Sequence, residues 1–124
     1  MNYYSFINKY GNVTYKEKKE TEIDILLFSQ LAYLPMDNID FKNDKKYSLE
    51  EIASNIDREV FLESLIAQRN ALKLLDTIKS LKRFKEIKVT DYTYIADNDS
   101  QFGAVSFILP NKMVVIAFQG TDNT

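Results

Sequence analysis

The sequence predicts an α/β fold, of which this chain of 124 residues carries helices first and strands after them. Apolar residues recur at helical spacing over about residues 21–82, and β-branched and aromatic residues dominate about 86–118. Helices followed by strands are α+β in appearance. The last strand, Met113 to Phe118, is apolar at every position, which is typical of a strand with neighbours on both edges and helices on both faces. We therefore interpret the chain as the first part of a larger sheet.

The composition limits the chemistry that this chain can perform. Sixteen basic and eighteen acidic residues leave a net charge of −2, so nothing favours nucleic acid or an anionic membrane as a partner. The chain has no cysteine, which excludes disulfides and thiolate metal sites. It also has no histidine, so neither an imidazole general base nor a histidine zinc site can be assembled from it. No metal and no cofactor are expected.

The N-terminus gives no sign of export. The first 22 residues lack an apolar core of signal-peptide length, and no stretch is apolar for long enough to span a bilayer. The cytoplasm is therefore the expected location.

Residues 1–20 are predicted to form an N-terminal arm that precedes the domain at 21–124. Four tyrosines and a basic group follow one another there, with a turn signal at Gly11-Asn12. The arm could be loose or a short hairpin. Its tyrosines could pack on the body of the protein, which is the simpler interpretation, or form a binding arm with aromatic faces and basic rims.

The first convincing helix is predicted from about Thr21 to Leu34. Thr21 is a good N-cap, and Glu22 and Asp24 place negative charge where the helix dipole favours it. Pro35 prevents continuation. The apolar residues at spacings of three and four are Ile23, Leu26, Leu27, Leu31 and Ala32.

Two further helical regions follow a polar loop. Ser48-Leu-Glu-Glu51 is a capping box, which predicts a short helix to about Ser54. A longer helical region runs from about Asp57 to Leu81, and the polar residues Gln68-Arg69-Asn70 suggest a bend within it. Its two apolar stripes are Phe61, Leu62, Leu65 and Ile66, and then Leu72, Leu75 and Ile78.

Three charged clusters are interpreted as structural. Lys79, Lys82 and Arg83 lie at the end of the long helical region, where cations complement the helix dipole. Asp37, Asp40 and Asp44 belong to the polar loop. Asp97-Asn-Asp-Ser100 resembles the start of a calcium loop, but the glycine and the distant glutamate of such a loop are missing, so a hairpin turn is favoured.

Three strands complete the chain as an antiparallel meander. The first includes Ile87, Val89 and Tyr92 to Ile95, the second runs from Gln101 to Leu109, and Pro110-Asn-Lys112 connects it to the third. Alternation places two sets of side chains of the second strand on opposite faces. These sets are Phe102, Ala104 and Ile108, and Val105, Phe107 and Leu109.

The end of the third strand is the candidate site. Gln119-Gly-Thr-Asp122 follows a strand that we expect to be buried, and the carboxyl ends of such strands line the ligand crevice of open α/β sheets. Gly120 permits a ligand to approach the backbone closely. Thr121 offers a backbone N–H and a hydroxyl, two donors that could stabilise an oxyanion. The alternative is an ordinary turn that ends the strand.

Two segments carry a resemblance to a known family. Gln101–Phe107 and Met113–Asp122 resemble the N-terminal part of bacterial lipase-like α/β-hydrolases, relatives of the class 3 lipases with a Phe-Arg-Gly-Thr-Asp signature. Phe28–Pro35 is similar to the helix that opens those proteins, so the resemblance extends from about residue 21 to the end. It implies that Thr121 contributes to an oxyanion hole shaped by Gly120. Gln119 stands where the family has arginine.

The nucleophile of that family is absent here. The resemblance implies a later Gly-x-Ser-x-Gly elbow, followed by an aspartate and a histidine, and residues 1–124 contain neither the elbow nor a histidine. The chain is therefore expected to be the truncated N-terminal portion of a serine hydrolase acting on ester or lipid substrates, and to be inactive alone. The alternative is a non-catalytic α+β interaction module that pairs through an exposed edge strand with a partner or with itself.

Overall fold

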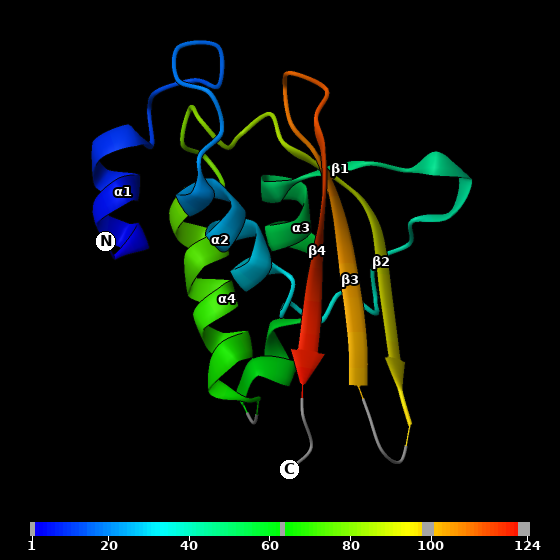
Figure 1. Cartoon of the computed structure of the whole chain (residues 1–124). Coiled ribbons are helices and arrows are strands. Elements are labelled where there is room, and N and C mark those ends of the chain that lie inside the picture. Colours follow the sequence, from blue (N-terminus) through cyan, green and yellow to red (C-terminus); the bar gives the residue numbers. More distant parts are fainter. Residues whose placement is uncertain (1, 63, 98–100, 122–124) are drawn as a thin grey trace.

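The computed structural model describes residues 2–62, 64–97 and 101–121 (Figure 1). Within these ranges the protein is a mixed α+β structure of four α-helices and one four-stranded antiparallel sheet. The α-helices are α1 (Tyr3–Tyr10), α2 (Glu22–Leu31), α3 (Leu49–Asn55) and α4 (Ile66–Ile78). The strands are β1 (Tyr47–Ser48), β2 (Lys88–Ala96), β3 (Gln101–Ile108) and β4 (Val114–Thr121). Short 3-10 helices cover Lys42–Asp44 and Arg58–Leu62.

The sheet is the predicted meander with one strand added. Its order is β1-β2-β3-β4, so β4 lies at the edge of the described sheet. Val105 pairs with both Tyr92 and Ala117, which sets the register of the three long strands. The sequence analysis missed β1, where Tyr47 pairs with Val89. Two residues are too few to show the alternation that identifies a strand.

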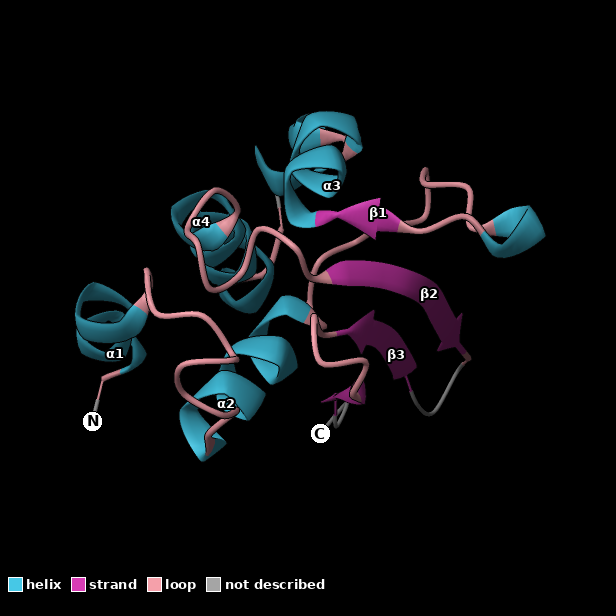
Figure 2. Ribbon diagram, turned by 90° about the horizontal axis from the view of Figure 1, so that it is seen from above, coloured by secondary structure: helices cyan, strands magenta, loops and turns pink. Residues whose placement is uncertain are grey.

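The described helices cover only one face of the sheet (Figures 1 and 2). Val105, Phe107 and Ala117 are buried against them, as the predicted alternation requires. On the opposite face, called the bare face below, Phe118 is 59% exposed. The other exposed large apolar side chains of the bare face are Ile95, Phe102, Val114 and Ile116. The expectation of helices on both faces of the last strand is thus met on one face in the described chain.

Helix α2 begins as predicted, and Leu27, Leu31 and Ala32 among its predicted apolar positions are buried. Thr21 is the N-cap and forms a reciprocal capping box with Asp24. The helix ends at Leu31 rather than Leu34, and Leu26, predicted to pack inward, is 55% exposed. The buried positions are Asp24, Leu27, Phe28 and Leu31. Burial of a charged residue shifts the inward face by one position, which an apolar pattern cannot reveal.

The long helical region breaks earlier than predicted. Helix α4 starts at Ile66 and runs without interruption through Gln68-Arg69-Asn70. Three polar residues cover less than one turn of helix and fit its outer side, so they need not interrupt it. Leu65 takes the N-cap position, and it and Ile66 are exposed, contrary to the predicted stripe. The inward residues of the helix are Ala71, Leu74, Leu75 and Ile78.

The first residues are more ordered than a loose arm or a hairpin. Tyr3–Tyr10 forms helix α1, which buries Phe6 and Ile7. Gly11 ends this helix. A Cβ atom on Gly11 would lie 2.5 Å from the carbonyl oxygen of Ile7 and 2.9 Å from a methyl group of Leu81, so only glycine fits this crossing.

The two ends of α4 provide a matched test of this packing. Ile78 is fully buried, whereas Ile66 is 67% exposed. Replacing Ile78 by alanine should lower the free energy of unfolding by about 2–5 kcal/mol, because it removes buried methyl groups and leaves a cavity. The same change at Ile66 should stay within about 0.5 kcal/mol of the wild type. Urea denaturation measures both, and equal losses would contradict the described orientation of α4.

Candidate functional site

The predicted oxyanion residues lie within a paired strand and not in a turn. Strand β4 continues past Phe118 because β3 pairs with it as far as Gln101. Gly120 lies opposite Phe102, and Thr121 lies opposite Gln101. Asp122, the last residue of the predicted turn, falls outside the described residues. The strand therefore delivers the backbone of both candidates to the carboxyl end of β4.

A row of three residues crosses the covered face of the sheet beside this strand end. Gln119 faces Gly103 on β3, and Tyr94 on β2 lies opposite Gly103 from the other side. The side chain of Gln119 is buried. A Cβ atom on Gly103 would lie 3.0 Å from Oε1 of Gln119, so the glycine makes room for that side chain. The sequence analysis gave Gly103 no role, because a lone glycine in a strand carries no signal of its partner.

The described residues supply no base or metal site at this strand end. The chain has no histidine, and no three acidic side chains in the described ranges stand close enough together to hold a metal ion. In the carboxylate-rich turn Asp97–Ser100, the residues Asn98, Asp99 and Ser100 lie outside the described residues. Successive N–H groups of a strand point to opposite edges, so of the backbone donors of Gly120 and Thr121 one faces β3 and the other faces the free edge. The proton chemistry of a hydrolase would need other groups.

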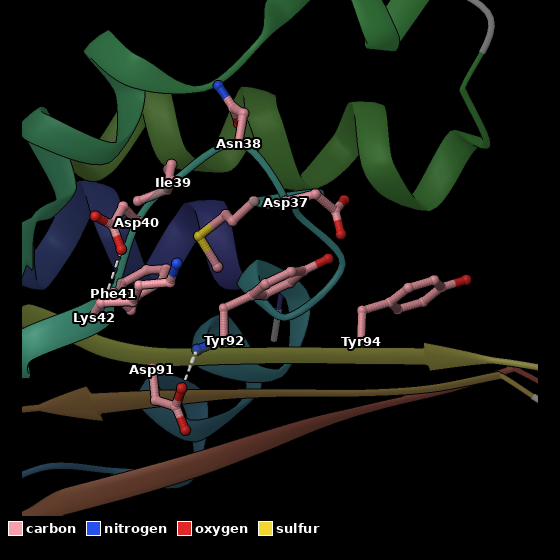
Figure 3. Close-up of a pocket in the computed structure, with 10 residues that line it drawn as sticks. Asp37, Asn38, Ile39, Asp40, Phe41, Lys42, Asp91, Tyr92 and Tyr94 are labelled. Carbon is pink, nitrogen blue, oxygen red and sulfur yellow. Dashed lines mark hydrogen bonds between the residues drawn. The ribbon is translucent and has the colours of Figure 1, made fainter.

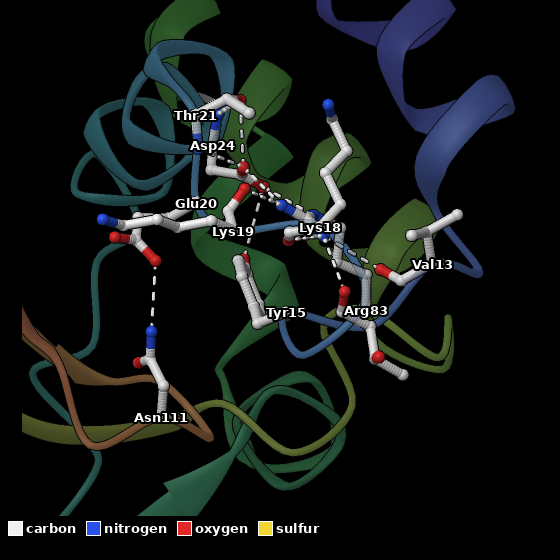
Figure 4. A network of polar contacts seen from close by, with 10 residues as sticks. Val13, Tyr15, Lys18, Lys19, Glu20, Thr21, Asp24, Arg83 and Asn111 are labelled. Atoms are coloured by element: carbon white, nitrogen blue, oxygen red, sulfur yellow. Dashed lines mark hydrogen bonds and ion pairs between the residues drawn. The ribbon is translucent and has the colours of Figure 1, made fainter.

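The most extensive polar cluster is a buried ion pair between Arg83 and Asp24 (Figure 4). Both side chains are fully enclosed. Arg83 Nε donates to Asp24 Oδ1 at 2.9 Å, and Nη2 donates to Oδ2 at 2.8 Å. This two-point geometry matches the planar guanidinium to the carboxylate. Thr21 also donates to Asp24 Oδ2 from its backbone N–H at 2.8 Å.

The same guanidinium holds the N-terminal segment in place. Its Nη1 donates to the carbonyl oxygens of Val13 at 3.0 Å and Lys18 at 2.9 Å, and Nη2 reaches that of Lys19 at 3.2 Å. The ring of Tyr15 stacks 4.1 Å from the guanidinium carbon. Arg83 thereby donates hydrogen bonds to backbone carbonyl groups that have no partner within a helix or strand.

This cluster is structural, because its polar atoms are occupied by one another. The sequence analysis placed Arg83 at a helix end as a dipole partner, whereas α4 ends at Ile78 and Arg83 points into the core. It assigned the charge of Asp24 to the first turn of α2, and the capping box confirms that part. No local pattern joins two residues so far apart in the chain, so the pair could not be found from sequence spacing.

These features describe an α+β protein with a sheet backed by helices on one side and an apolar edge strand that ends in Gln-Gly-Thr. Residues 78–124 match the model of a family described as Mbeg1-like. The match includes Arg83 and all of β2, β3 and β4. Neither a curated protein nor a solved structure matches the chain. In the described ranges, none of the helices has the length and apolar character that crossing a membrane requires.

Tyr15 should make the stability of the protein depend on pH. Burial, followed by the negative charge of Asp24, raises the pKa of Tyr15 above its ordinary value. A raised pKa in the folded state contributes stability that is fully present below the unfolded pKa of about 10 and is lost as pH rises above it. Tyr15→Phe should remove part of that alkaline loss in urea denaturation. An unchanged slope between neutral and alkaline pH would contradict this role.

Proposed function

We propose that this chain forms the N-terminal part of a lipase-like serine hydrolase that acts on ester or lipid substrates. The observation that carries the proposal is the strand β4, which brings Gly120 and Thr121 to its carboxyl end at the sheet edge. A backbone donor held by a paired strand is oriented before a substrate arrives. Such preorganised donors are the usual means of stabilising an oxyanion. The nucleophile and its base would come from outside residues 1–124.

The exposed apolar side chains of the bare face favour the proposal that the sheet belongs to a larger protein. Five large apolar side chains lie exposed on it, and Phe102 contacts Phe118 with ring centres 5.7 Å apart. Exposed apolar side chains that gather in one patch mark a surface that another element covers. Polar residues of this face include Asp91 and Thr93 on β2 and Ser106 on β3. Four of the five exposed apolar side chains lie on β3 and β4, and three of them belong to the edge strand itself.

The usual handedness of crossover connections is consistent with a further strand beside β4. A strand added parallel to β4 at its free edge would need a crossover helix, and about 98% of such crossovers are right-handed. In Figure 1, β4 runs downward with the helices on its left, and its free edge is nearest the viewer. A right-handed crossover from the lower end of β4 to a strand in front of it passes on the right. Its helix would therefore lie over the bare face.

The role of Thr121 can be tested in a full-length protein that continues past residue 124. Thr121→Val should lower kcat for short p-nitrophenyl esters by about tenfold or more, with a smaller effect on KM, because a donor to the oxyanion acts in the transition state. An unchanged kcat would show that the hydroxyl of Thr121 does not donate to the oxyanion.

The proposed location of the nucleophile and its base outside residues 1–124 gives a second test. A fluorophosphonate probe should label the full-length protein and leave the 124-residue chain unlabelled, since the chain has no histidine to activate a serine. Labelling of the short chain would show that a nucleophile lies within residues 1–124. A reading frame that continues without a Gly-x-Ser-x-Gly elbow would count against the hydrolase altogether.

A second candidate function is supported by the same free edge. The chain could be a non-catalytic interaction module in which β4 pairs with a partner strand or with a second copy. Exposed edge strands bind in this way through main-chain hydrogen bonds. The bare face adjoining the edge would add apolar contacts.

Self-association of the isolated chain tests this second candidate. Ile116 lies exposed on the bare face of β4, and Leu26 is similarly exposed on α2, on the other side of the sheet. If copies associate through β4, Ile116→Lys should yield monomers in sedimentation equilibrium, because it buries a charge in the contact. Leu26→Lys, the matched control, should associate as the wild type does. A wild-type chain that is monomeric throughout the micromolar range would contradict pairing with a second copy.

A further inference from the structure

A hollow lies between the loop 36–42 and strand β2 (Figure 3), and it shares only Tyr94 with the row of residues beside the end of β4. Its volume is about 650 Å³. Pockets that hold small molecules typically have volumes of about 300–1,000 Å³. The apolar and aromatic residues that line it are Met36, Ile39, Phe41, Tyr92 and Tyr94.

Two aromatic rings stand side by side on one wall of this hollow. Tyr92 and Tyr94 are two residues apart on β2, so both project toward the loop (Figure 3). Neither is fully enclosed, and Tyr94 is 38% exposed. The face of an aromatic ring carries partial negative charge and attracts cations. The wall therefore offers a surface suited to a positive group.

The charged side chains that line the hollow differ in whether they form hydrogen bonds or ion pairs within the protein. Asp40 accepts from Lys45 Nζ at 3.1 Å and from the backbone N–H of Lys42 at 2.9 Å. Asp91 points away from the loop in Figure 3. In the described part of the chain, no lysine or arginine forms an ion pair with Asp37. Lys42 also lines the hollow and brings one positive charge to the side next to Asp40.

The carboxylate of Asp37 lies beside the hydroxyl of Tyr92 (Figure 3). Burial, followed by the charge of Asp37, raises the pKa of Tyr92 to about 12. The phenol is therefore neutral at physiological pH. The end of the hollow around Asp37 thus combines one carboxylate, a neutral phenol and two ring faces, a combination that favours a cation and disfavours an anion.

We propose that this hollow binds a small organic cation through an ammonium group seated against Tyr92 and Tyr94, with its charge toward Asp37. Either a methylated or a primary ammonium satisfies this chemistry. A methylated group profits most from the ring faces, since it cannot donate hydrogen bonds to water and is easily desolvated. The site is independent of the proposed hydrolase, because it uses none of the residues at the end of β4.

Choline and its uncharged carbon isostere test the proposal on the unaltered 124-residue chain. The isostere is dimethylbutanol, in which a tert-butyl group replaces the trimethylammonium group, so the two ligands differ in charge and hardly in shape. An NMR titration should show choline binding roughly tenfold more tightly than the isostere, as cation–π and carboxylate attraction together imply. The shifts should fall on residues 36–42 and on β2. Equal affinities, or no shifts with either ligand, would overturn the proposal.

Two variants and a control locate the cation. Tyr94→Leu keeps apolar bulk and removes a ring face, so it should weaken choline several-fold and leave the isostere unchanged. Asp37→Asn should likewise weaken the binding of choline and leave the binding of the isostere unchanged. Asp44→Asn removes the same charge from the same loop outside the lining, and should bind choline as the wild type does. An equal loss in Asp44→Asn would show that general electrostatics, and not a site, attracts the cation.

Discussion

The buried pair of Arg83 and Asp24 is the interaction on which the arrangement of the N-terminal half depends. Removing two charges from water is costly, and the cost is offset only when geometry and further hydrogen bonds are favourable. Here two short contacts join the pair, and backbone carbonyls and a threonine satisfy its remaining atoms. The pair ties the segment before α2 to the connection between α4 and β2. A single side chain thus holds three parts of the chain that share no regular hydrogen bonding.

The pair of Arg83 and Asp24 also affects which side of α2 packs against the sheet. Asp24 occupies the inward side of α2, so that Leu27, Phe28 and Leu31 turn toward the core, where Phe28 contacts Phe107 with ring centres 4.9 Å apart. Asn111, in the connection between β3 and β4, donates to Glu20 at 3.1 Å. The N-terminal segment is therefore joined to the sheet from two directions. With the helices held on that side, the other face of β3 and β4 is exposed in the described residues.

Local features of the fold could be predicted from the sequence, and features set by distant partners could not. The capping residues Thr21 and Ser48 predict helices because their hydrogen bonds join residues only three positions apart in the chain. The meander follows from short connections and alternating side chains. The apolar pattern of α2 predicts the burial of Leu27 and Leu31, but not that of Asp24, which depends on Arg83 far along the chain. For the candidate site, the position of Gly120 and Thr121 at the strand end could be predicted, whereas the room that Gly103 makes for Gln119 depends on strand register.

A double-mutant cycle on Asp24 and Arg83 tests most directly whether this pair organises the structure. Removing one partner of a buried pair leaves an unpaired charge and typically costs about 3–5 kcal/mol. Asp24→Leu and Arg83→Met should each lower the free energy of unfolding by about that amount in urea. The double variant should be no less stable than Arg83→Met alone, because the carboxylate that loses its partner is then also gone. Losses that simply add in the double variant would show that the two residues act independently and would contradict this account.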